Sequence, residues 1–222
     1  MSSKEIATEA LGLASVQYNY LHKYIDDKSY TKPASFSSTS IRELLSKLAE
    51  DQRFDGLFKE PGFENVDLLF EKHESLILEY WNAWSINDPV KQFQESQEAA
   101  VALLVETVAP GTHSYNFFTC HLLTTSHAIR ILLPSMPAKY HVNLVRQWWL
   151  LTLAVYIAEL RPKIDPDYVP GGVGTKNWGY VEDKALNSPY LADAHYVKGR
   201  YHVRSSHEKL FSANTWGSNS GN

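Results

Sequence analysis

The chain has 222 residues, a mass of 25.2 kDa, a net charge of −4 and a sequence pI near 6.1. A hydrophobic share of 44% and a charged share of 21% are typical of a folded globular protein and exclude collagen-like, coiled-coil and wholly disordered chains. Because Asp and Glu outnumber Lys and Arg and no basic block occurs, we expect no nucleic-acid partner.

The cellular compartment is suggested by cysteine usage and by the N-terminal sequence. The single cysteine, Cys120, cannot form an internal disulfide, which favours a reducing compartment. The polar start MSSKEIATEA lacks the apolar stretch of a signal peptide. The longest apolar run, 148–158, is far shorter than the ~20 residues of a membrane span. We therefore expect a cytoplasmic protein that does not enter a membrane.

In chain order, the first predicted element is a short helix within 7–20, where the apolar spacing is partly regular. The next is an amphipathic helix that starts near Ser40. Its apolar residues recur at i, i+3, i+4 and i+7, as Ile41, Leu44, Leu45 and Leu48. Ser40 is the expected N-cap, and Glu43 completes a capping box.

Five further helices are predicted from periodicity and from the Pro and Gly residues between segments. They span about 65–84, 91–109, 114–132, 138–160 and 189–211, the last with Ser188 as N-cap and Pro189 in its first turn. No segment shows the strict alternation of a strand. The sequence therefore predicts an all-α fold, an irregular bundle of about six to seven helices.

The same patterns divide the chain into three parts. We expect a partly ordered N-terminal segment at 1–34, a helical domain at 35–211 and a flexible tail at 212–222. The glycine-rich stretch 170–174 is the main predicted loop, and it is suited to covering an active site because glycine permits close approach to a ligand.

Histidines are the main chemical signal, since five of the nine lie in the segments 114–132 and 189–211. His121 shares a buried-looking stripe with Phe117 and Ala128, whereas His127, six residues on, points to another face. A core histidine bonded to a carbonyl or a water is the alternative interpretation of His121.

On the last predicted helix, Leu191, His195, Lys198 and His202 form a stripe beside an apolar one. A lysine at the edge of a packed face is paired, desolvated or chemically modified, because an unpaired buried ammonium is costly. The alternative is a solvent-facing edge on which Lys198 pairs with Asp193 or Glu208.

His121 and His195 are therefore candidate ligands of one metal ion, since imidazole binds iron, zinc, copper and nickel. No ExxH or HExxH pair occurs, which favours a mononuclear site over a di-iron or zincin site. A neutral Lys198 amine can take up carbon dioxide, and the resulting carbamate presents two oxygens to a metal. A zinc-dependent hydrolase is a weaker alternative.

Other catalytic patterns are missing. Cys120 and His121 are adjacent on a helix and do not face each other, so they form no Cys-His nucleophile pair. There is no GxSxG elbow, and GGVGTK is neither a Walker A loop nor a dinucleotide fingerprint.

Three blocks carry a family resemblance: NFFTCHLLTTSHAIRILLPSMP, YIAELRP and LADAHYVKGRYH. In this order they resemble the questin oxidase-like family of fungal secondary metabolism, over about 35–211. The matching residues are His121, Pro134, Tyr156, Pro162, Asp193, His195 and Lys198. The chain resembles the C-terminal half of such proteins and lacks their His-rich segment of the HNHxxHH kind.

The resemblance implies an enzyme that oxidatively cleaves a ring of an anthraquinone-like aromatic polyketide, as a monooxygenase of Baeyer-Villiger type or as a dioxygenase. It implies non-haem iron held by His121, His195 and a carboxylated Lys198, with NADPH as electron donor in some members. Because only half of the family pattern is matched, the alternative is a non-catalytic paralogue or partner subunit, forming a homo-oligomer or joining a complementary half-chain.

Overall fold

The computed structural model describes residues 3–109, 115–169 and 177–199. These parts form ten helices and no strand, which confirms the all-α prediction with more helices than the six to seven expected. The α-helices are α1 (Lys4–Val16), α2 (Lys23–Asp26), α3 (Ile41–Glu50), α4 (Glu64–Lys72), α5 (Glu74–Ala83), α6 (Pro89–Val105), α7 (Phe117–Leu132), α8 (His141–Ala158), α9 (Trp178–Asn187) and a terminal helix at 194–199. None of the described helices is long and apolar enough to cross a membrane.

The chain divides into two compact units, Met1–Pro33 and Ala34–Asn222. The first unit contains α1 and α2. Ser3 caps α1 by accepting a hydrogen bond from the Ile6 amide at 3.3 Å, and no residue of α1 is buried. The helix expected within 7–20 thus starts earlier and ends earlier than predicted.

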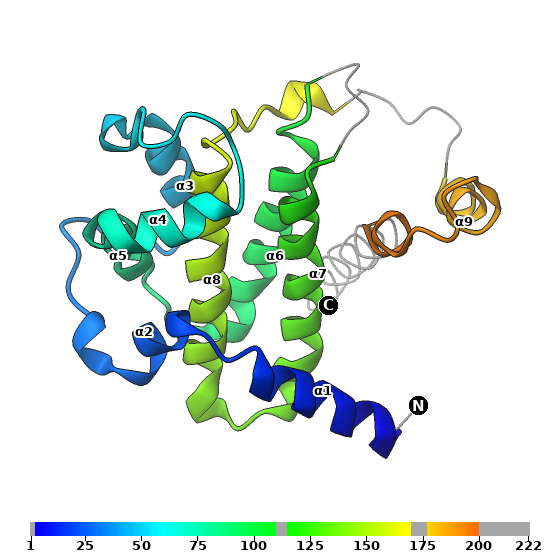
Figure 1. Ribbon diagram of the computed structural model, residues 1–222, viewed down its shortest axis with the longest axis horizontal. Coiled ribbons are helices and arrows are strands. Elements are labelled where there is room, and N and C mark those ends of the chain that lie inside the picture. Colours follow the sequence, from blue (N-terminus) through cyan, green and yellow to red (C-terminus); the bar gives the residue numbers. More distant parts are fainter. Residues whose placement is uncertain (1–2, 110–114, 170–176, 200–222) are drawn as a thin grey trace, which may run out of the picture. The chain divides into compact units, whose positions relative to one another are not determined.

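In the second unit, α8 packs against α4 and α5 as well as α6 and α7 (Figure 1). Its sequence is apolar almost all round, as expected for a helix enclosed by neighbours. Two adjacent tryptophans tie it to its neighbours: Trp148 Nε1 donates to the Leu122 carbonyl at 3.1 Å, and Trp149 Nε1 donates to the Tyr80 carbonyl at 3.2 Å. The core of the second unit therefore surrounds α8.

Helix α3 forms as its sequence predicts. Its apolar face is buried through Ile41, Leu44, Leu45 and Leu48. The Ser40 hydroxyl accepts from the Glu43 amide, but the Glu43 carboxylate accepts from Ser38 Oγ at 2.5 Å rather than from the Ser40 amide. Half of the expected capping box is thus replaced by a contact with Ser38, two residues before the N-cap.

The helix predicted at about 65–84 is two helices, because His73 adopts a non-helical conformation between α4 and α5. Asn65 does not begin the first of them. It lies inside α4, where its side-chain Nδ2 donates to the Ala158 carbonyl at 3.0 Å and to the Glu60 carbonyl at 2.8 Å. Asp88 caps α6 at Pro89, two residues before the predicted start.

The C-terminal part differs most from the prediction. Helix α9 was not expected, and Pro189 lies in a turn rather than in a helix. The helix containing His195 starts at 194, because Asp193 Oδ1 accepts from the His195 and Tyr196 amides at 2.8 and 3.2 Å. Three predicted features lie outside the described residues: the loop 170–174, the part of the predicted helix beyond 199 with His202 and Glu208, and the tail 212–222.

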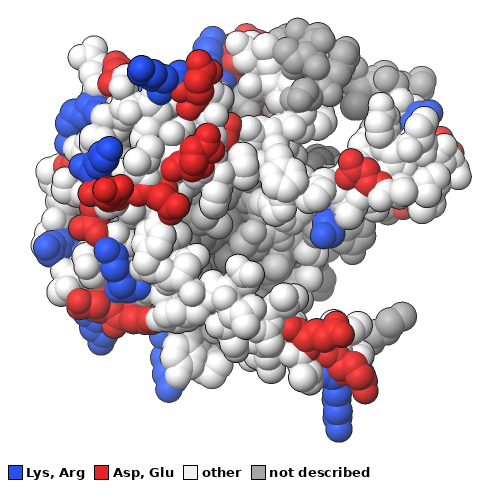
Figure 2. Space-filling model, viewed as in Figure 1, with Lys and Arg blue, Asp and Glu red and all other residues white. Residues whose placement is uncertain are grey.

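Charged side chains of both signs are mixed over the part of the surface formed by α3, α4 and α5 (Figure 2). Interspersed charges of this kind are typical of a solvated surface rather than of a patch of one sign.

Candidate functional site

The candidate site starts at the N-terminus of α7. Asn116 caps this helix, since its Oδ1 accepts from the Phe118 amide at 2.8 Å and the Thr119 amide at 3.0 Å. Phe117 and His121 follow on successive turns of the same side of the helix, and both are exposed. The cap therefore fixes the backbone from which both side chains project.

The prediction that His121 lies on the buried face of α7 is wrong. The buried face consists of Thr119, Cys120, Leu122, Leu123, Ser126 and Ile129. Polar residues can occupy it because their hydroxyls bond to the helix itself: Thr119 donates to the Asn116 carbonyl and Ser126 to the Leu123 carbonyl. The apolar Phe117, used to assign the face, is 53% exposed.

The His121 ring has a defined orientation. Its Nδ1 lies 2.8 Å from the Phe117 carbonyl oxygen. A carbonyl only accepts, so Nδ1 is the donor, and in the neutral ring Nε2 then carries the lone pair. This arrangement is typical of a metal-binding histidine, in which one ring nitrogen is held by a carbonyl and the other binds the ion.

The second imidazole comes from the terminal helix at 194–199. His195 Nδ1 lies 3.7 Å from the carboxylate of Asp193, the residue that caps this helix. Asp193 therefore both starts the helix and faces the imidazole. His195 and Lys198 are exposed.

The two predicted histidines meet in space. The ring centroids of His121 and His195 are 5.1 Å apart, at an angle of 52°. The Phe117 ring contacts both, with centroid distances of 4.4 Å to His121 and 4.8 Å to His195. Residues from two distant parts of the sequence thus form one surface cluster, which we call the His121–His195 pair.

Cys120 lies beneath this pair. Its Sγ is 4.0 Å from the His195 carbonyl and would be 3.8 Å from a Cβ atom at Gly199. Burial raises the pKa of the Cys120 thiol, and the nearby Asp193 charge adds to the effect, whereas Lys198 opposes it. This environment therefore disfavours the thiolate, the form in which a cysteine acts as a nucleophile.

The exposure of Lys198 corrects another expectation. The sequence placed Lys198 at the edge of a packed face, where burial would favour a neutral amine, but the side chain is exposed. Carboxylation of Lys198 thus gains no help from desolvation in this structure.

The donor set matches part of a mononuclear metal site. Two imidazoles with ring centroids 5.1 Å apart offer two potential ligands. Within the described residues no three His, Cys, Asp or Glu side chains come together. The third ligand expected from the resemblance is the carbamate of Lys198, one turn after His195 on the same helix.

Glu159 is a titratable residue that the sequence analysis did not single out. It follows α8, and its Oε2 accepts from Asn116 Nδ2 at 2.6 Å, next to the start of α7. Burial raises the pKa of the Glu159 carboxyl, the Asn116 hydrogen bond lowers it and the Glu64 charge raises it. An acidic residue at a helix C-terminus is unfavourable, because it lies at the negative end of the helix dipole. This position could have marked Glu159 in the sequence as an unusual residue.

Several other residues of the matched blocks make structural contacts away from the His121–His195 pair. Tyr156 donates to the Pro162 carbonyl at 3.1 Å, and Pro134 lies in the 3₁₀ turn that follows α7. His127 Nδ1 accepts from Arg130 at 2.7 Å.

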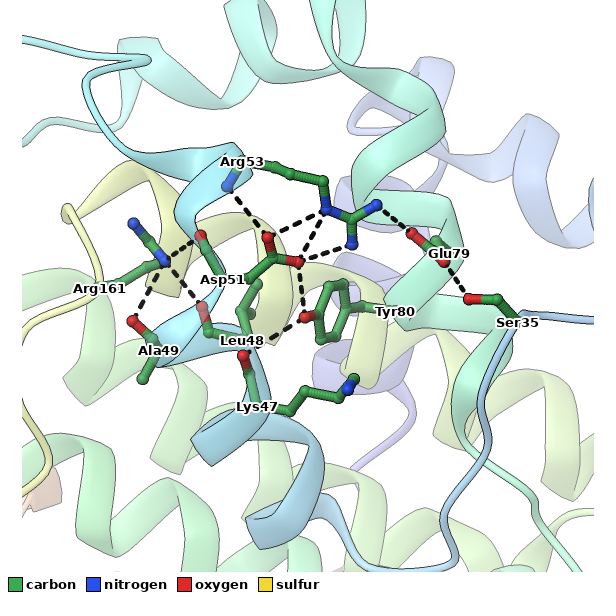
Figure 3. Close-up of polar contacts among 9 residues, drawn as sticks. All are labelled: Ser35, Lys47, Leu48, Ala49, Asp51, Arg53, Glu79, Tyr80 and Arg161. Atoms are coloured by element: carbon green, nitrogen blue, oxygen red, sulfur yellow. Dashed lines mark hydrogen bonds and ion pairs between the residues drawn. The ribbon is translucent and has the colours of Figure 1, made fainter.

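Arg161 links the end of α8 to α3. Its guanidinium donates to the carbonyls of Leu48 at 2.8 Å and Asp51 at 2.9 Å (Figure 3). Three carbonyls at or just beyond the C-terminus of α3 are thus bound by one side chain, since Ala49 also accepts from it.

Comparison with known proteins places the chain in a family. No curated protein and no solved structure is significantly similar to it. A family model described as questin oxidase-like matches residues 1–202 of the 222. The match includes the first 34 residues, which the motifs had not indicated. The chain therefore belongs to the questin oxidase-like family.

Proposed function

We propose that this protein is an oxidoreductase of fungal aromatic polyketide metabolism that cleaves a ring of a hydroxylated anthraquinone-like substrate. Family membership supports the oxidoreductase class. The observation that locates the proposed active site is the proximity of His121 and His195 beside Phe117. Their ring centroids are 5.1 Å apart.

The pair is suited to holding iron. His121 Nε2 and a His195 ring nitrogen would supply two ligands, and a carboxylated Lys198 would supply oxygen. Together they would form the two-histidine, one-carboxylate set of non-haem Fe(II) oxygenases. When bound, iron supplies the chemistry of dioxygen, which amino-acid side chains lack. Lys198 enters this set only after its amine loses a proton and adds carbon dioxide.

The protein's own residues supply an aromatic surface next to the pair. Phe63 stacks on Phe118 at 5.1 Å between centroids, and Phe118 contacts Phe117 edge-on at 5.4 Å. Phe63 and Phe117 are about half exposed, so a planar ring can pack on them at the solvent side. Their role is to bind and orient the substrate ring against the two imidazoles.

Two oxygen balances are compatible with ring cleavage. A dioxygenase breaks a carbon–carbon bond and places both oxygen atoms in the product without a reductant. A Baeyer-Villiger monooxygenase inserts one atom next to a carbonyl and releases the other as water, with two electrons from NADPH. Incorporation of one or two ¹⁸O atoms from ¹⁸O₂ distinguishes the two.

Iron binding is the decisive experiment. The protein is loaded anaerobically with Fe(II) and bicarbonate, desalted, and its iron content measured by elemental analysis. We expect about one iron per chain, strong losses in His121→Ala and His195→Ala, and no loss in His73→Ala, which changes a histidine between α4 and α5. A folded wild-type protein that retains no iron would reject the proposal.

A second candidate function is a non-catalytic subunit that joins another chain. The exposed Phe63 and Phe117 at the pair favour it, because contiguous exposed apolar side chains are typical of an interaction surface. Light scattering that shows a strict monomer at all concentrations would count against a self-associating form.

A further inference from the structure

A cleft at the end of α8 is separate from the residues of the His121–His195 pair. It has a volume of about 340 Å³ and is lined by Phe54, Asp55, Gly56, Phe58, Ile157, Leu160 and Arg161. Its size falls at the lower end of the range for small-molecule sites, enough for a one- or two-ring molecule.

Unusual backbone conformations gather at this cleft. Among the described residues, positive φ angles occur at Leu160 (63°), Arg161 (52°) and Gly56 (68°). All three residues line the cleft. Strained backbone in folded proteins tends to be kept at ligand-binding sites, where the surrounding structure holds it in place.

The turn that ends α8 needs a left-handed residue at position 160, but it does not need a leucine there. The chain leaves α8 through a turn in which the Arg161 amide donates to the Tyr156 carbonyl at 2.9 Å and the Leu160 amide to the Ile157 carbonyl at 3.0 Å. The left-handed residue of such a turn is usually glycine. A leucine at this position adds an apolar side chain, 40% exposed, to the wall of the cleft.

The left-handed backbone conformation of Leu160 and Arg161 is stabilised by contacts with residues outside the turn. The Arg161 side chain is 9% exposed and is fixed by the α3 carbonyls and by Asp55, which it contacts at 2.5 Å (Figure 3 shows the carbonyl contacts). The Arg161 side of the cleft is therefore held in place by contacts that do not involve a ligand, which reduces the entropy lost there on binding.

The polar edge of the cleft favours a neutral hydrogen-bond donor. The Asp55 carboxylate uses Oδ1 to bind Arg161, and its side chain is 65% exposed. Its second oxygen is thus accessible as an acceptor. An anionic ligand would face this carboxylate, and the Arg161 guanidinium beside it is already bound to Asp55 and to the α3 carbonyls. Phe58 and Leu160 offer an apolar surface to a ring.

We propose that the cleft at the end of α8 binds a small one- or two-ring aromatic molecule with a hydroxyl group, the ring packing on Phe58 and Leu160 and the hydroxyl donating to Asp55. This site is independent of iron at the His121–His195 pair and of the proposed oxidoreductase activity.

The test is a fluorescence titration of the full chain with 2-naphthol, without iron. We expect saturable binding, weaker binding of 2-methoxynaphthalene, which lacks the donor, and weaker binding of anionic 2-naphthoate. No saturation by 2-naphthol, or tighter binding of 2-naphthoate, would overturn the proposal.

Two variants locate the binding. Leu160→Gly removes a wall but suits the positive φ, so the thermal midpoint is kept or raised while affinity for 2-naphthol falls about tenfold. Phe58→Ala gives a similar loss of affinity. The matched control Leu186→Ala removes an exposed leucine on α9 and leaves affinity unchanged. Unchanged affinity in both cleft variants would place the ligand elsewhere and overturn the proposal.

Discussion

Arg161 shows how a single side chain joins distant elements. It is nearly buried and donates to three carbonyls at or just beyond the C-terminus of α3, as well as to Asp55. Helix C-termini leave unpaired carbonyls, which a cation satisfies well. The Arg-Pro motif at the end of α8 is thus explained by the need to close α3, and Arg161 acts on the fold without contacting the pair.

Arg161→Ala is expected to lower the free energy of unfolding by about 3 kcal/mol, because several charge-assisted hydrogen bonds are lost and the carbonyls stay partly buried. Arg161→Lys recovers part of this, since one ammonium cannot reproduce the guanidinium fork. Urea unfolding followed by tryptophan fluorescence measures the change. The exposed Arg42 on α3 is the control, and Arg42→Ala should change stability by less than about 0.5 kcal/mol.

The environment of Glu159 predicts that its contribution to the stability of the fold falls as pH rises. Burial raises the pKa of its carboxyl in the folded state, with Glu64 as the facing charge and Asn116 as the opposing donor. A raised folded pKa gives stability that is fully present below the unfolded pKa, about 4.3, and is lost as pH rises through the folded value. At neutral pH the ionised carboxylate therefore destabilises the fold.

Glu159→Gln should accordingly be more stable than the wild type at pH 7, by less than about 1 kcal/mol because the group is only half-buried. The gain should shrink as pH falls towards 4. Urea unfolding at both pH values measures it, with Glu95→Gln on the exposed side of α6 as the control. A less stable Glu159→Gln at pH 7 would mean that the Asn116 bond to the carboxylate outweighs burial.

At the scale of elements, the terminal helix at 194–199 depends on its cap. Asp193→Ala removes two hydrogen bonds to the His195 and Tyr196 amides, which costs such a helix about 1 kcal/mol. We expect amide hydrogen exchange at 195–198 to become roughly fivefold faster, with the thermal midpoint of the chain unchanged. Asp193→Asn keeps a capping oxygen and should exchange like the wild type. Equal exchange in all three proteins would show that the helix does not depend on the cap.

Which helices the sequence could predict depends on how local their determinants are. Helix α3 has a cap, a regular apolar stripe and a polar opposite face, all within eleven residues of sequence, 40–50. The break at His73 has no Pro or Gly to mark it. In 188–193, Pro189 is favourable for a helix start, but the capping carboxylate of Asp193 sets the start later. Helix boundaries are thus hardest to predict where the sequence gives no break signal, or where two start signals lie within a few residues of each other.

The sequence predicted that His121 and His195 lie near each other, but it did not predict their environment. The excess of histidine pointed to His121 and His195, and the structure brings their rings together. Their exposure could not be predicted, because the buried face of α7 is set by packing against α6 and α8, which accepts Thr119 and Ser126. Periodicity treats such residues as polar and assigns them to solvent, although their hydroxyls are satisfied within the helix.

At the scale of the molecule, long-range contacts converge on α8 and its end. Trp149 bonds to α5, Asn65 of α4 bonds to the Ala158 carbonyl, and Glu159 bonds to the cap of α7. Because α4, α5 and α7 are all tied to α8 or to its end, loss of one of these contacts affects this group of helices as a whole. We therefore expect this group to unfold cooperatively, and a ligand bound on α7 to stabilise it as a whole.

This coupling gives a test of the metal site by stability alone. An ion bound only to the folded chain, at a free concentration of 100 times its dissociation constant, adds about 2.7 kcal/mol. In a chain of this size that raises the thermal midpoint by roughly 5–10 °C. We expect this shift with Fe(II) and bicarbonate under anaerobic conditions, its loss in His121→Ala and His195→Ala, and its retention in His73→Ala. If Lys198 is a ligand through its carbamate, Lys198→Met removes the dependence on bicarbonate. A shift of equal size in the two histidine variants would place the ion elsewhere, because both imidazoles of the pair would then be dispensable.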